Sequence, residues 1–304
     1  MNLNGKVAVV TGSGRGLGLA YASALAAAGA AVVVNDVDGE SAGQAVKQIT
    51  AAGGRAHAVV APVGTAETAD ALVDAAVSTF GRLDVMVTNA GILRDRVLWK
   101  MTDDDFDQVV EVHLRGTFTC ARAAAVRMRE QGEGGRLILA GSPAGQRGNF
   151  GQTNYAAAKS GIAAMVRTWA MELAKAGITV NAVVPNAATA MTKTIPAFAP
   201  HIEALEQRGE PLPDWLRKGV GFGTAEDVAG VVVFLASDAA GSVNGQCVGI
   251  GGDKLSLWSH PEEVSVAYRD RGWNADDIAT VWPTSVGAEP RTYGIAALQN
   301  LPRT

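Results

Sequence analysis

The stretch VAVVTGSGRGLG at residues 7–18 decides the fold of this chain. Its apolar start predicts a short buried strand at Val7–Thr11, and the glycine-rich turn that follows opens a helix predicted over Gly16–Ala28. Glycines permit a tight turn and let the backbone approach a pyrophosphate, whose charge is stabilised by the helix N-terminus. A second predicted strand, Ala31–Asp36, completes the strand–helix–strand unit that a dinucleotide-binding turn requires.

The same alternation of short apolar runs and Ala-rich segments continues through most of the 304 residues. It predicts an α/β fold with a single Rossmann-like, doubly wound parallel sheet of about seven strands and helices on both faces. The further strands are expected at Ala56–Ala61, Asp84–Thr88, Arg136–Ala140, Thr179–Val184 and Gln246–Gly249. The further helices are expected at Glu40–Ala52, Glu67–Phe80, Asp104–Gln131, Tyr155–Lys175 and Ala225–Ser237. Glycines stand where four helices should end, at Gly29, Gly53, Gly81 and Gly177.

Two stretches interrupt this alternation. Residues 186–223 contain four prolines and are expected to form a long irregular insertion that serves as a lid over the substrate. From residue 253 the pattern fades into a C-terminal extension, with partial helix expected at Pro261–Ala279. We expect a dinucleotide-binding and catalytic domain over residues 1–252, and an extension over 253–304 that is not an independent domain. Leu255–Ser259 is expected to pack on the core or on a neighbouring subunit.

Composition argues against several classes of function. The net charge of −4 gives no attraction to nucleic acid or to an anionic membrane, and no apolar run approaches the roughly 20 residues that span a bilayer. Cys120 and Cys247 lie in apolar surroundings and are expected in the core, without a disulfide. No histidine or cysteine cluster has metal-ligand spacing, so no metal is expected. The N-terminus shows no charged leader or cleavable apolar stretch, so we expect a cytoplasmic protein.

The end of the second predicted strand bears on the choice of cofactor. Asp36 could accept hydrogen bonds from both hydroxyls of the adenosine ribose and would repel the additional phosphate of NADP. Val37 offers that phosphate no cation. Arg15 is the contrary signal, because it could reach a 2′-phosphate, although it could equally be a solvated residue beside the pyrophosphate. We therefore expect NAD in preference to NADP, held in the glycine-rich turn by Gly12, Ser13, Arg15, Gly16, Leu17 and Gly18.

A group of three side chains suggests the chemistry. Tyr155 and Lys159 lie one helical turn apart and share a face, and Ser142 ends a predicted strand just before their helix. Free tyrosine titrates near pH ~10, and a nearby ammonium and a cationic nicotinamide would each lower that pKa by roughly 1–3 units. Tyr155 could then take the proton of an alcohol while hydride leaves for NAD, and return it in the reverse reaction. Ser142 would hold the reacting oxygen, and Lys159 would also bind the nicotinamide ribose.

Together these motifs resemble the short-chain dehydrogenase/reductase family, over about residues 5–252. TGSGRGLG, the turn Asn89-Ala90-Gly91, Ser142 and Tyr155-Ala156-Ala157-Ala158-Lys159 have the order and spacing of that family. The resemblance implies that Asn89, Ala90 and Gly91 stabilise the sheet beside the cofactor, and that Pro185 and Thr192 border the nicotinamide. It also implies a homodimer or homotetramer formed through the two longest helices.

A narrower resemblance concerns the loops expected around the mouth of the site. NAGILRDR (89–96), VHLRG (112–116), GNFGQ (148–152) and AVVPN (182–186) are similar to the dehydrogenase region of peroxisomal multifunctional enzyme type 2, also called 17β-hydroxysteroid dehydrogenase type 4. This likeness implies oxidation of a (3R)-3-hydroxyacyl-CoA with NAD. A 17β-hydroxysteroid or another bulky alcohol is the alternative substrate, and a catalytically idle NAD-binding scaffold is the alternative class. Gln152, Asn186 and Met191 are expected to contact substrate.

Several positions depart from the common family pattern or leave two interpretations open. His113 stands where most members have an Asn that anchors a water leading protons to the lysine, so we expect it to support Lys159. Gly64 replaces an Asp that commonly binds adenine, and the backbone around Val63 is expected to substitute for it. Asn186 replaces the usual glycine after the proline. The segment Arg94–Arg96 could be a solvated loop or could meet a phosphate of CoA.

Overall fold

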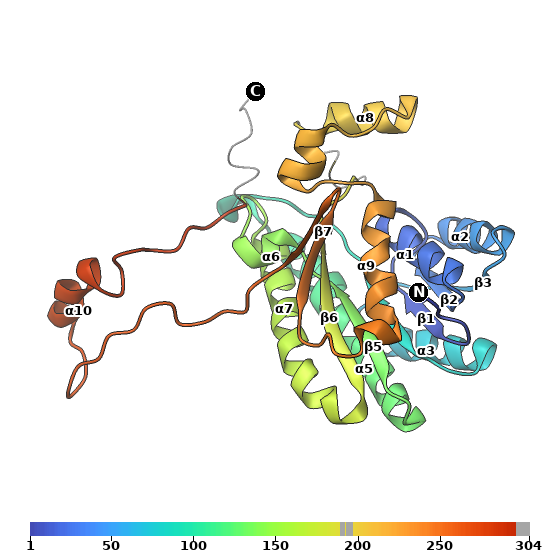
Figure 1. Ribbon diagram of the computed structural model, residues 1–304, viewed down its shortest axis with the longest axis horizontal. Coiled ribbons are helices and arrows are strands. Elements are labelled where there is room, and N and C mark those ends of the chain that lie inside the picture. Colours follow the sequence, from blue (N-terminus) through green and yellow to red (C-terminus); the bar gives the residue numbers. More distant parts are fainter. Residues whose placement is uncertain (189–191, 193–196, 296–304) are drawn as a thin grey trace.

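The computed structural model describes residues 1–188, 192 and 197–295. Within them the chain forms an eight-stranded sheet of order β3-β2-β1-β4-β5-β6-β7-β8, parallel except for the last strand (Figure 1). The strands are β1 Val7–Val10, β2 Ala31–Asp36, β3 Arg55–Val60, β4 Val85–Thr88, β5 Gly135–Ala140, β6 Ile178–Pro185, β7 Cys247–Gly251 and β8 Lys254–Leu257. The predicted doubly wound α/β fold is confirmed. The expected seven strands are joined by an eighth, because the alternating segment Lys254–Leu257 adds an antiparallel edge.

Helices cover both faces of the sheet, as the uniformly apolar strands predict. Alternate residues of one strand point to opposite faces, so Ala8 and Val10 of β1 pack in one core cluster while Val7 and Val9 pack in the other. The first cluster is completed by α1, α2 and α9, and the second by α3, α5 and α7. The bounds are α1 Gly16–Ala27, α2 Gly39–Ala51, α3 Ala66–Phe80, α5 Gly116–Gln131, α7 Thr153–Leu173 and α9 Ala225–Ala236.

Helix ends largely follow the sequence prediction. The four glycines expected at helix ends all have positive φ, a backbone conformation that favours glycine. The single helix expected over Asp104–Gln131 has three parts: α4 Asp103–Val109, a π-helical stretch Val110–Arg115, and α5. The apolar period of this segment did not predict the π-helical stretch. His113 lies in that stretch and is buried.

The lid prediction was wrong about the local structure of residues 186–223. Helix α8, Ala199–Arg208, and a π-helical turn at Trp215–Val220 lie within this segment. They enclose a small apolar cluster of their own, built on Phe198, Ile202, Leu212, Leu216 and Phe222. Of the prolines that suggested an irregular chain, Pro196 lies outside the described residues, Pro200 lies in the first turn of α8, and Pro211 and Pro213 lie in the connection between the two helical pieces.

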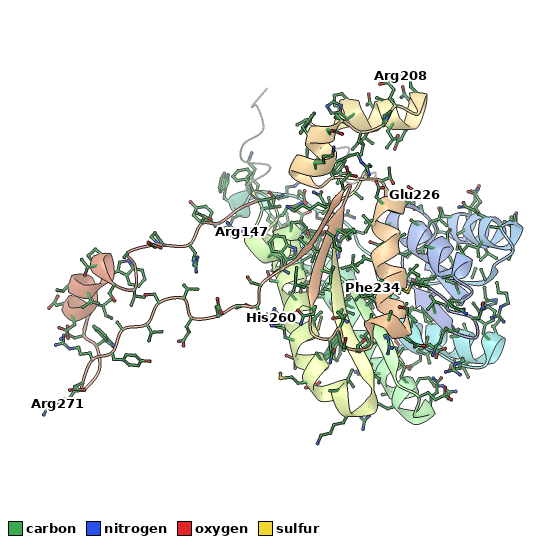
Figure 2. All side chains as sticks on the ribbon, viewed as in Figure 1. Arg147, Arg208, Glu226, Phe234, His260 and Arg271 are labelled. Atoms are coloured by element: carbon green, nitrogen blue, oxygen red, sulfur yellow. The ribbon has the colours of Figure 1, made fainter. Side chains whose placement is uncertain are left out.

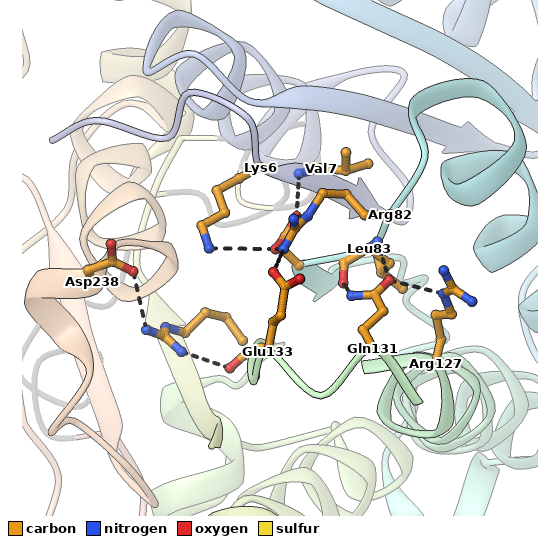
Figure 3. A network of polar contacts seen from close by, with 11 residues as sticks. Lys6, Val7, Arg82, Leu83, Arg127, Gln131, Glu133 and Asp238 are labelled. Atoms are coloured by element: carbon orange, nitrogen blue, oxygen red, sulfur yellow. Dashed lines mark hydrogen bonds and ion pairs between the residues drawn. The ribbon is translucent and has the colours of Figure 1, made fainter. Parts of the chain in front are cut away.

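The N-terminal ends of the central strands are joined by a polar network (Figure 3). Asp84 accepts hydrogen bonds from the side chain of Arg82 and, at 2.9 Å, from the backbone N–H of Val7. Arg82 also pairs with Glu133 at 2.6 Å, and Lys6 lies 3.6 Å from Asp84. The network therefore links β1, β4 and the residues just before β5. It lies at the N-terminal ends of these strands, and the glycine-rich turn lies at the opposite ends.

Beyond β8 the chain leaves the body and returns to it, forming a long projection over residues 259–293 that we call the arm (Figures 1 and 2). The helix expected at Pro261–Ala279 is confined to α10, Ala275–Val281. At its start, the His260 ring lies 2.9 Å from the backbone oxygen of Gly245. At its end, the Gly294 N–H donates to the Arg147 carbonyl at 2.7 Å. Both ends of the arm are thus attached to the body.

Candidate active site

The three predicted catalytic residues meet at the carboxyl end of β5. Ser142 follows β5 and caps the short helix α6, Pro143–Arg147, where its Oγ accepts a hydrogen bond from the Ala144 N–H at 3.2 Å. Tyr155 and Lys159 lie in the first turns of α7 and share one of its faces. The Lys159 Nζ lies 5.6 Å from the centre of the Tyr155 ring. The expected grouping is therefore present in space.

The electrostatics of this group differ from the expectation. Burial raises the pKa of Tyr155, a hydrogen bond with Ser142 lowers it, and the negative charge of Asp95 raises it. Burial also lowers the pKa of Lys159 to about 7. Its Nζ donates to the carbonyl of Ala140 at 2.6 Å. The predicted fall in the tyrosine pKa is therefore not a property of the protein alone, because sequence reasoning counted the nearby charges and left out burial.

His113 packs against Tyr155, the tyrosine predicted to be catalytic. Its ring meets the Tyr155 ring edge-on, with centroids 5.1 Å apart. Its Nε2 lies within hydrogen-bonding distance of both the N–H and the carbonyl of Ile92, at 3.0 and 2.8 Å. Burial, reinforced by the charge of Lys159 and opposed by the Ile92 hydrogen bond, lowers the pKa of His113 to about 3. The histidine is thus a neutral group that supports the tyrosine ring and fixes the loop after β4.

A buried asparagine that the sequence prediction missed holds the start of α7. The Asn154 side chain donates to the carbonyls of Arg94 and Asp105, at 3.0 and 2.8 Å, and accepts from the Tyr155 N–H. It therefore ties the catalytic helix to the loop after β4 and to α4. Its position directly before Tyr155 was the available signal.

The glycine-rich turn has the close contacts that its sequence predicted. A Cβ on Gly18 would lie 2.1 Å from the Gly12 carbonyl oxygen, and a Cβ on Gly12 would lie 2.7 Å from the Cα of Ala90. Ser13 is buried; its hydroxyl donates to the Val10 carbonyl at 2.6 Å and its backbone N–H donates to the Asn35 carbonyl at 2.8 Å, so both of its donors hold the turn in place. Arg15 is exposed at the N-cap of α1 and makes no side-chain capping bond. The N-terminus of α1 thus keeps its N–H groups for an anion.

Asp36 stands beside this turn, at the end of β2. It is 8% exposed and accepts hydrogen bonds from the N–H groups of Gly14 and Asp38, at 3.0 and 3.1 Å. Each carboxylate oxygen keeps a further lone pair for a ribose hydroxyl. Val37 beside it is 66% exposed and uncharged. A glycine turn, an uncapped helix start and a fixed carboxylate fit the adenosine and pyrophosphate of a nicotinamide dinucleotide.

The turn after β4 has the structural role that the family resemblance implied. The Asn89 amide donates to the carbonyls of Thr11 and Gly12, both at 3.1 Å, and Ala90 donates through its backbone to the Thr11 hydroxyl. A Cβ on Gly91 would lie 2.2 Å from the His113 ring. The turn therefore joins the glycine-rich loop to the histidine under the tyrosine.

The structure gives a physical reason for the departure at Gly64. Its φ is +124°, which a side chain rarely adopts, and a Cβ there would lie 2.6 Å from a carboxylate oxygen of Glu111. Arg115 donates to the Gly64 carbonyl at 2.9 Å. Val63 packs against Gly116, where a Cβ would lie 2.9 Å from its side chain. An aspartate at position 64 would therefore be strained, and an adenine contact from the backbone around Val63 stays a prediction.

A cavity of about 960 Å³ opens above the catalytic group. It is lined at its base by Ser142, Tyr155 and Leu17, and by Pro185 and Thr192, which were predicted to border the nicotinamide. Gln152 and Asn186, predicted to contact substrate, also line it, whereas Met191 lies outside the described residues. The segment predicted to be a lid contributes Phe198 and Val220, and the segments beyond β7 contribute Lys254, Ser256, Trp258 and Ile295.

Three lining residues had no role in the sequence prediction, or an ambiguous one. Asp95, in the segment that could have been solvated, accepts from the Gln152 amide at 2.9 Å, and burial raises its pKa. Trp258 packs on the core, as expected for Leu255–Ser259, and also reaches the cavity. Ile295 lies two residues beyond the far end of the arm. No pattern in the sequence predicts that a residue so far along the chain from the other lining residues reaches the cavity.

Among the described residues, no helix is long and apolar enough to cross a membrane. Cys120 and Cys247 are both buried free thiols, as predicted. Within the same part of the chain, no three His, Cys, Asp or Glu residues are grouped so that they could hold a metal ion.

Comparisons with known proteins identify the family of this chain. The chain matches the family model described as Enoyl-(Acyl carrier protein) reductase over residues 12–252, and it belongs to the short-chain dehydrogenase/reductase family. It is 42% identical to the hydroxyacyl-CoA dehydrogenase ChsB1 of Mycobacterium tuberculosis, over 96% of this chain and 89% of that one. It is 44% identical to mouse peroxisomal multifunctional enzyme type 2 over 204 residues, which are 64% of this chain and 27% of that longer protein.

A solved structure of similar shape is a short-chain dehydrogenase from Mycobacterium avium, with a TM-score of 0.83 at 35% identity. The match covers 97% of this chain and 100% of that one, so it includes most of the extension that the family model leaves out. The chain is therefore an oxidoreductase of this family, acting on CH–OH groups with a nicotinamide cofactor.

Proposed function

We propose that the enzyme oxidises a (3R)-3-hydroxyacyl-CoA thioester to the 3-oxoacyl-CoA with NAD. The observation that carries this proposal is the large cavity, whose walls come from the lid and the extension as well as from the catalytic group. Its size suits a long substrate better than a small alcohol. The relative that covers almost the whole chain, extension included, is named as a hydroxyacyl-CoA dehydrogenase.

In the proposed reaction the substrate hydroxyl lies between Ser142 and Tyr155. NAD, when bound, supplies the hydride acceptor and a positive nicotinamide ring. Tyr155 takes the hydroxyl proton while the carbinol C–H bond breaks with its electron pair, leaving a ketone. Lys159 would orient the nicotinamide ribose and stabilise the tyrosinate. His113 would keep the tyrosine ring in place. The proton leaves to solvent, and in the reverse reaction Tyr155 returns it.

The alternative substrate is a 17β-hydroxysteroid or another bulky secondary alcohol, because the same wide cavity would admit a rigid ring system. Purified protein should be assayed with (3R)- and (3S)-hydroxyacyl-CoA esters of several chain lengths and with a series of 17β-hydroxysteroids. We expect the (3R)-thioesters to give the highest kcat/KM. Turnover of steroids alone would contradict the acyl-CoA proposal. Binding of NADH without turnover of any alcohol would favour an idle scaffold.

We further propose that NAD is preferred to NADP, because Asp36 faces the turn with a fixed carboxylate and Val37 supplies no cation. In Asp36→Ala, kcat/KM with NAD should fall about 10- to 100-fold, since hydrogen bonds to a charged acceptor are lost, while kcat/KM with NADP should rise. Asp38→Ala is the matched control, since it removes an exposed carboxylate that caps α2. Equal use of both cofactors by the wild type would contradict this preference.

Two further parts of the proposal come from the family and from composition. We propose a homodimer or homotetramer, which sedimentation of the purified protein would test. We also propose a cytoplasmic enzyme, which fractionation of the producing cells would test.

A further inference from the structure

The arm, residues 259–293, carries apolar side chains that remain largely exposed in the part of the chain that the structure describes. None of its residues is buried. Soluble monomers expose single large apolar residues, but they rarely expose a concentrated set. Here eight large apolar residues of one short segment are between 36% and 91% exposed: Val264, Val266, Tyr268, Trp273, Ile278, Trp282, Val286 and Tyr293. Figure 2 shows the side chains of the arm projecting to both sides of a ribbon that stands clear of the body.

The contacts inside the arm are too few to stabilise it alone. Helix α10 has seven residues, and isolated helices of that length are marginal in water. The Asn274 side chain accepts from the Asp277 N–H at 2.9 Å, and Arg269 pairs with Asp277 at 2.8 Å. The Trp282 ring packs closely on Gly287. These contacts shape the tip of the arm without giving it a core, so its ordering needs an external surface.

A second copy of this chain is the partner that fits the arm best. The arm contains six acidic and three basic residues, so it is unsuited to an anionic membrane or to nucleic acid. Its 35 residues are comparable to the roughly 20–30 residues that each partner gives to a standard interface. The body of the same chain exposes apolar side chains on α5 and α7, namely Phe118, Val126 and Met171, on the two helices through which the family resemblance implies that subunits pair, so the arm would extend that expected interface. Each copy would therefore carry both an arm and a surface to receive one, as a symmetric pair requires.

The arm leaves and rejoins the body beside the catalytic cavity. Figure 1 shows it projecting from the side of the molecule where α6 and α7 lie. Arg147, at the end of α6, donates to the Thr292 hydroxyl at 2.7 Å and to the Gly294 carbonyl at 3.3 Å. The next residue, Ile295, lines the cavity together with Arg147. The end of the arm is thus continuous with a wall of the substrate cavity.

We propose that the arm docks on the body of a second copy of this chain, and that this docking fixes Ile295 as a wall of the cavity. Association of subunits would thereby complete the substrate site of the subunit that provides the arm. The docking itself does not depend on the proposed substrate, whereas the effect on catalysis rests on the proposed function.

The association is tested with the double variant Val266→Asp/Ile278→Asp. Both side chains are about half exposed and lie outside the cavity, so the variant should fold. Sedimentation equilibrium should show that the variant needs a protein concentration at least ~100-fold higher than the wild type to form the largest wild-type species. Val60→Asp, which charges an equally exposed residue of β3, is the control and should keep the wild-type mass. A monomeric wild type, or a variant of unchanged mass, would overturn the docking.

A cross-linking experiment identifies the occupant. A photoreactive phenylalanine analogue in place of Tyr268, which is 91% exposed, should cross-link to peptides of the body. When ¹⁵N-labelled and unlabelled chains are co-assembled, these products should include pairs of mixed isotope composition. Cross-links confined to one chain would overturn docking on a second copy.

The link to the cavity has a readout that needs no substrate. The Gly294 N–H is hydrogen-bonded to the Arg147 carbonyl, so its hydrogen exchange should be slow in the wild type and at least tenfold faster in the double variant. The KM for the acyl-CoA should rise in the same variant, and the KM for NAD should not. If association is lost while exchange at Gly294 is unchanged, the arm does not brace the cavity. Faster exchange without turnover of any thioester would contradict only the proposed substrate.

Discussion

The two ends of the sheet use charged residues in opposite ways. At the N-terminal ends of the strands, Arg82, Asp84 and Glu133 are joined by short hydrogen bonds, so each charge has a partner. At the carboxyl ends, Lys159 is buried against a backbone carbonyl, and its pKa falls to about 7. His113 lies nearby, and its Nδ1 has no hydrogen-bond partner among the residues that the structure describes. Paired charges stabilise the fold, whereas burial without an opposite charge favours the neutral forms of Lys159 and His113.

Tyr155→Phe should cause the largest effect of the substitutions considered. The effect should be on catalysis at the carboxyl ends of the strands and not on the stability of the fold. Loss of a general acid–base group lowers kcat by about 10²- to 10⁴-fold, whereas the ring that meets His113 remains. The free energy of unfolding and the Kd for NADH, measured by denaturation and by fluorescence titration, should stay near the wild-type values. Near-normal turnover would mean that Tyr155 is not the acid–base group. A large loss of NADH affinity would mean that the tyrosine acts mainly in binding.

Asp84→Ala tests the other end of the sheet, where we expect an effect on stability without an effect on chemistry. The substitution removes the acceptor of the buried Val7 N–H and the partner of Arg82, which should cost about 3 kcal/mol of unfolding free energy. Glu133→Ala is the matched control from the same network, and its exposed pair with Arg82 should be worth less than about 1 kcal/mol. A fall in kcat/KM at temperatures where Asp84→Ala is fully folded would show that the two ends are coupled.

Most of the fold and the group of three predicted catalytic residues could be predicted from the sequence. The strands were recognisable because they are short apolar runs covered on both faces, and the helix ends because glycines mark them. Strand β8 was missed because its alternating residues lie at an exposed edge, and α8 because prolines flank it. The glycine-rich turn and the three catalytic residues follow local spacings, so they could be found without a structure.

Features that depend on contacts between distant segments could not be predicted from the sequence. Arg147 and Thr292 are 145 positions apart, yet they are hydrogen-bonded to each other beside the cavity that Arg147 lines. Asp95 joins the cavity through Gln152, 57 positions away. The pKa of Tyr155 was predicted in the wrong direction for the protein alone, because burial is a property of the packed structure.

The acid sensitivity of His113 gives a smaller effect at the carboxyl end. Its pKa is about 3 in the folded protein and near 6.5 in an unfolded chain, so below pH 6.5 the unfolded state binds the additional proton. Stability should therefore fall as the pH drops from 7 to 5, by about 2 kcal/mol from this group. His113→Asn keeps polar atoms near Ile92 but does not titrate, so its loss over the same pH range should be smaller by that amount. Lys159 titrates in both proteins, so the difference between their denaturation midpoints isolates the imidazole. Equal losses in the two proteins would show that His113 is not kept neutral by burial.

Phe150→Ser should give the smallest effect, because this residue lines the mouth of the cavity but is 83% exposed. A substrate that covers part of the ring would lose about 1 kcal/mol of apolar contact, equivalent to about a fivefold rise in KM for the acyl-CoA. The KM for NAD and the free energy of unfolding should not change, because the ring packs on nothing that the fold requires. Val60→Ser, at the far edge of the sheet, should leave both KM values unchanged. An equal rise in the KM for NAD would show that the mouth and the cofactor end of the cavity are not independent. Substrate and NAD would then not bind to separate parts of the site at the carboxyl ends of the strands.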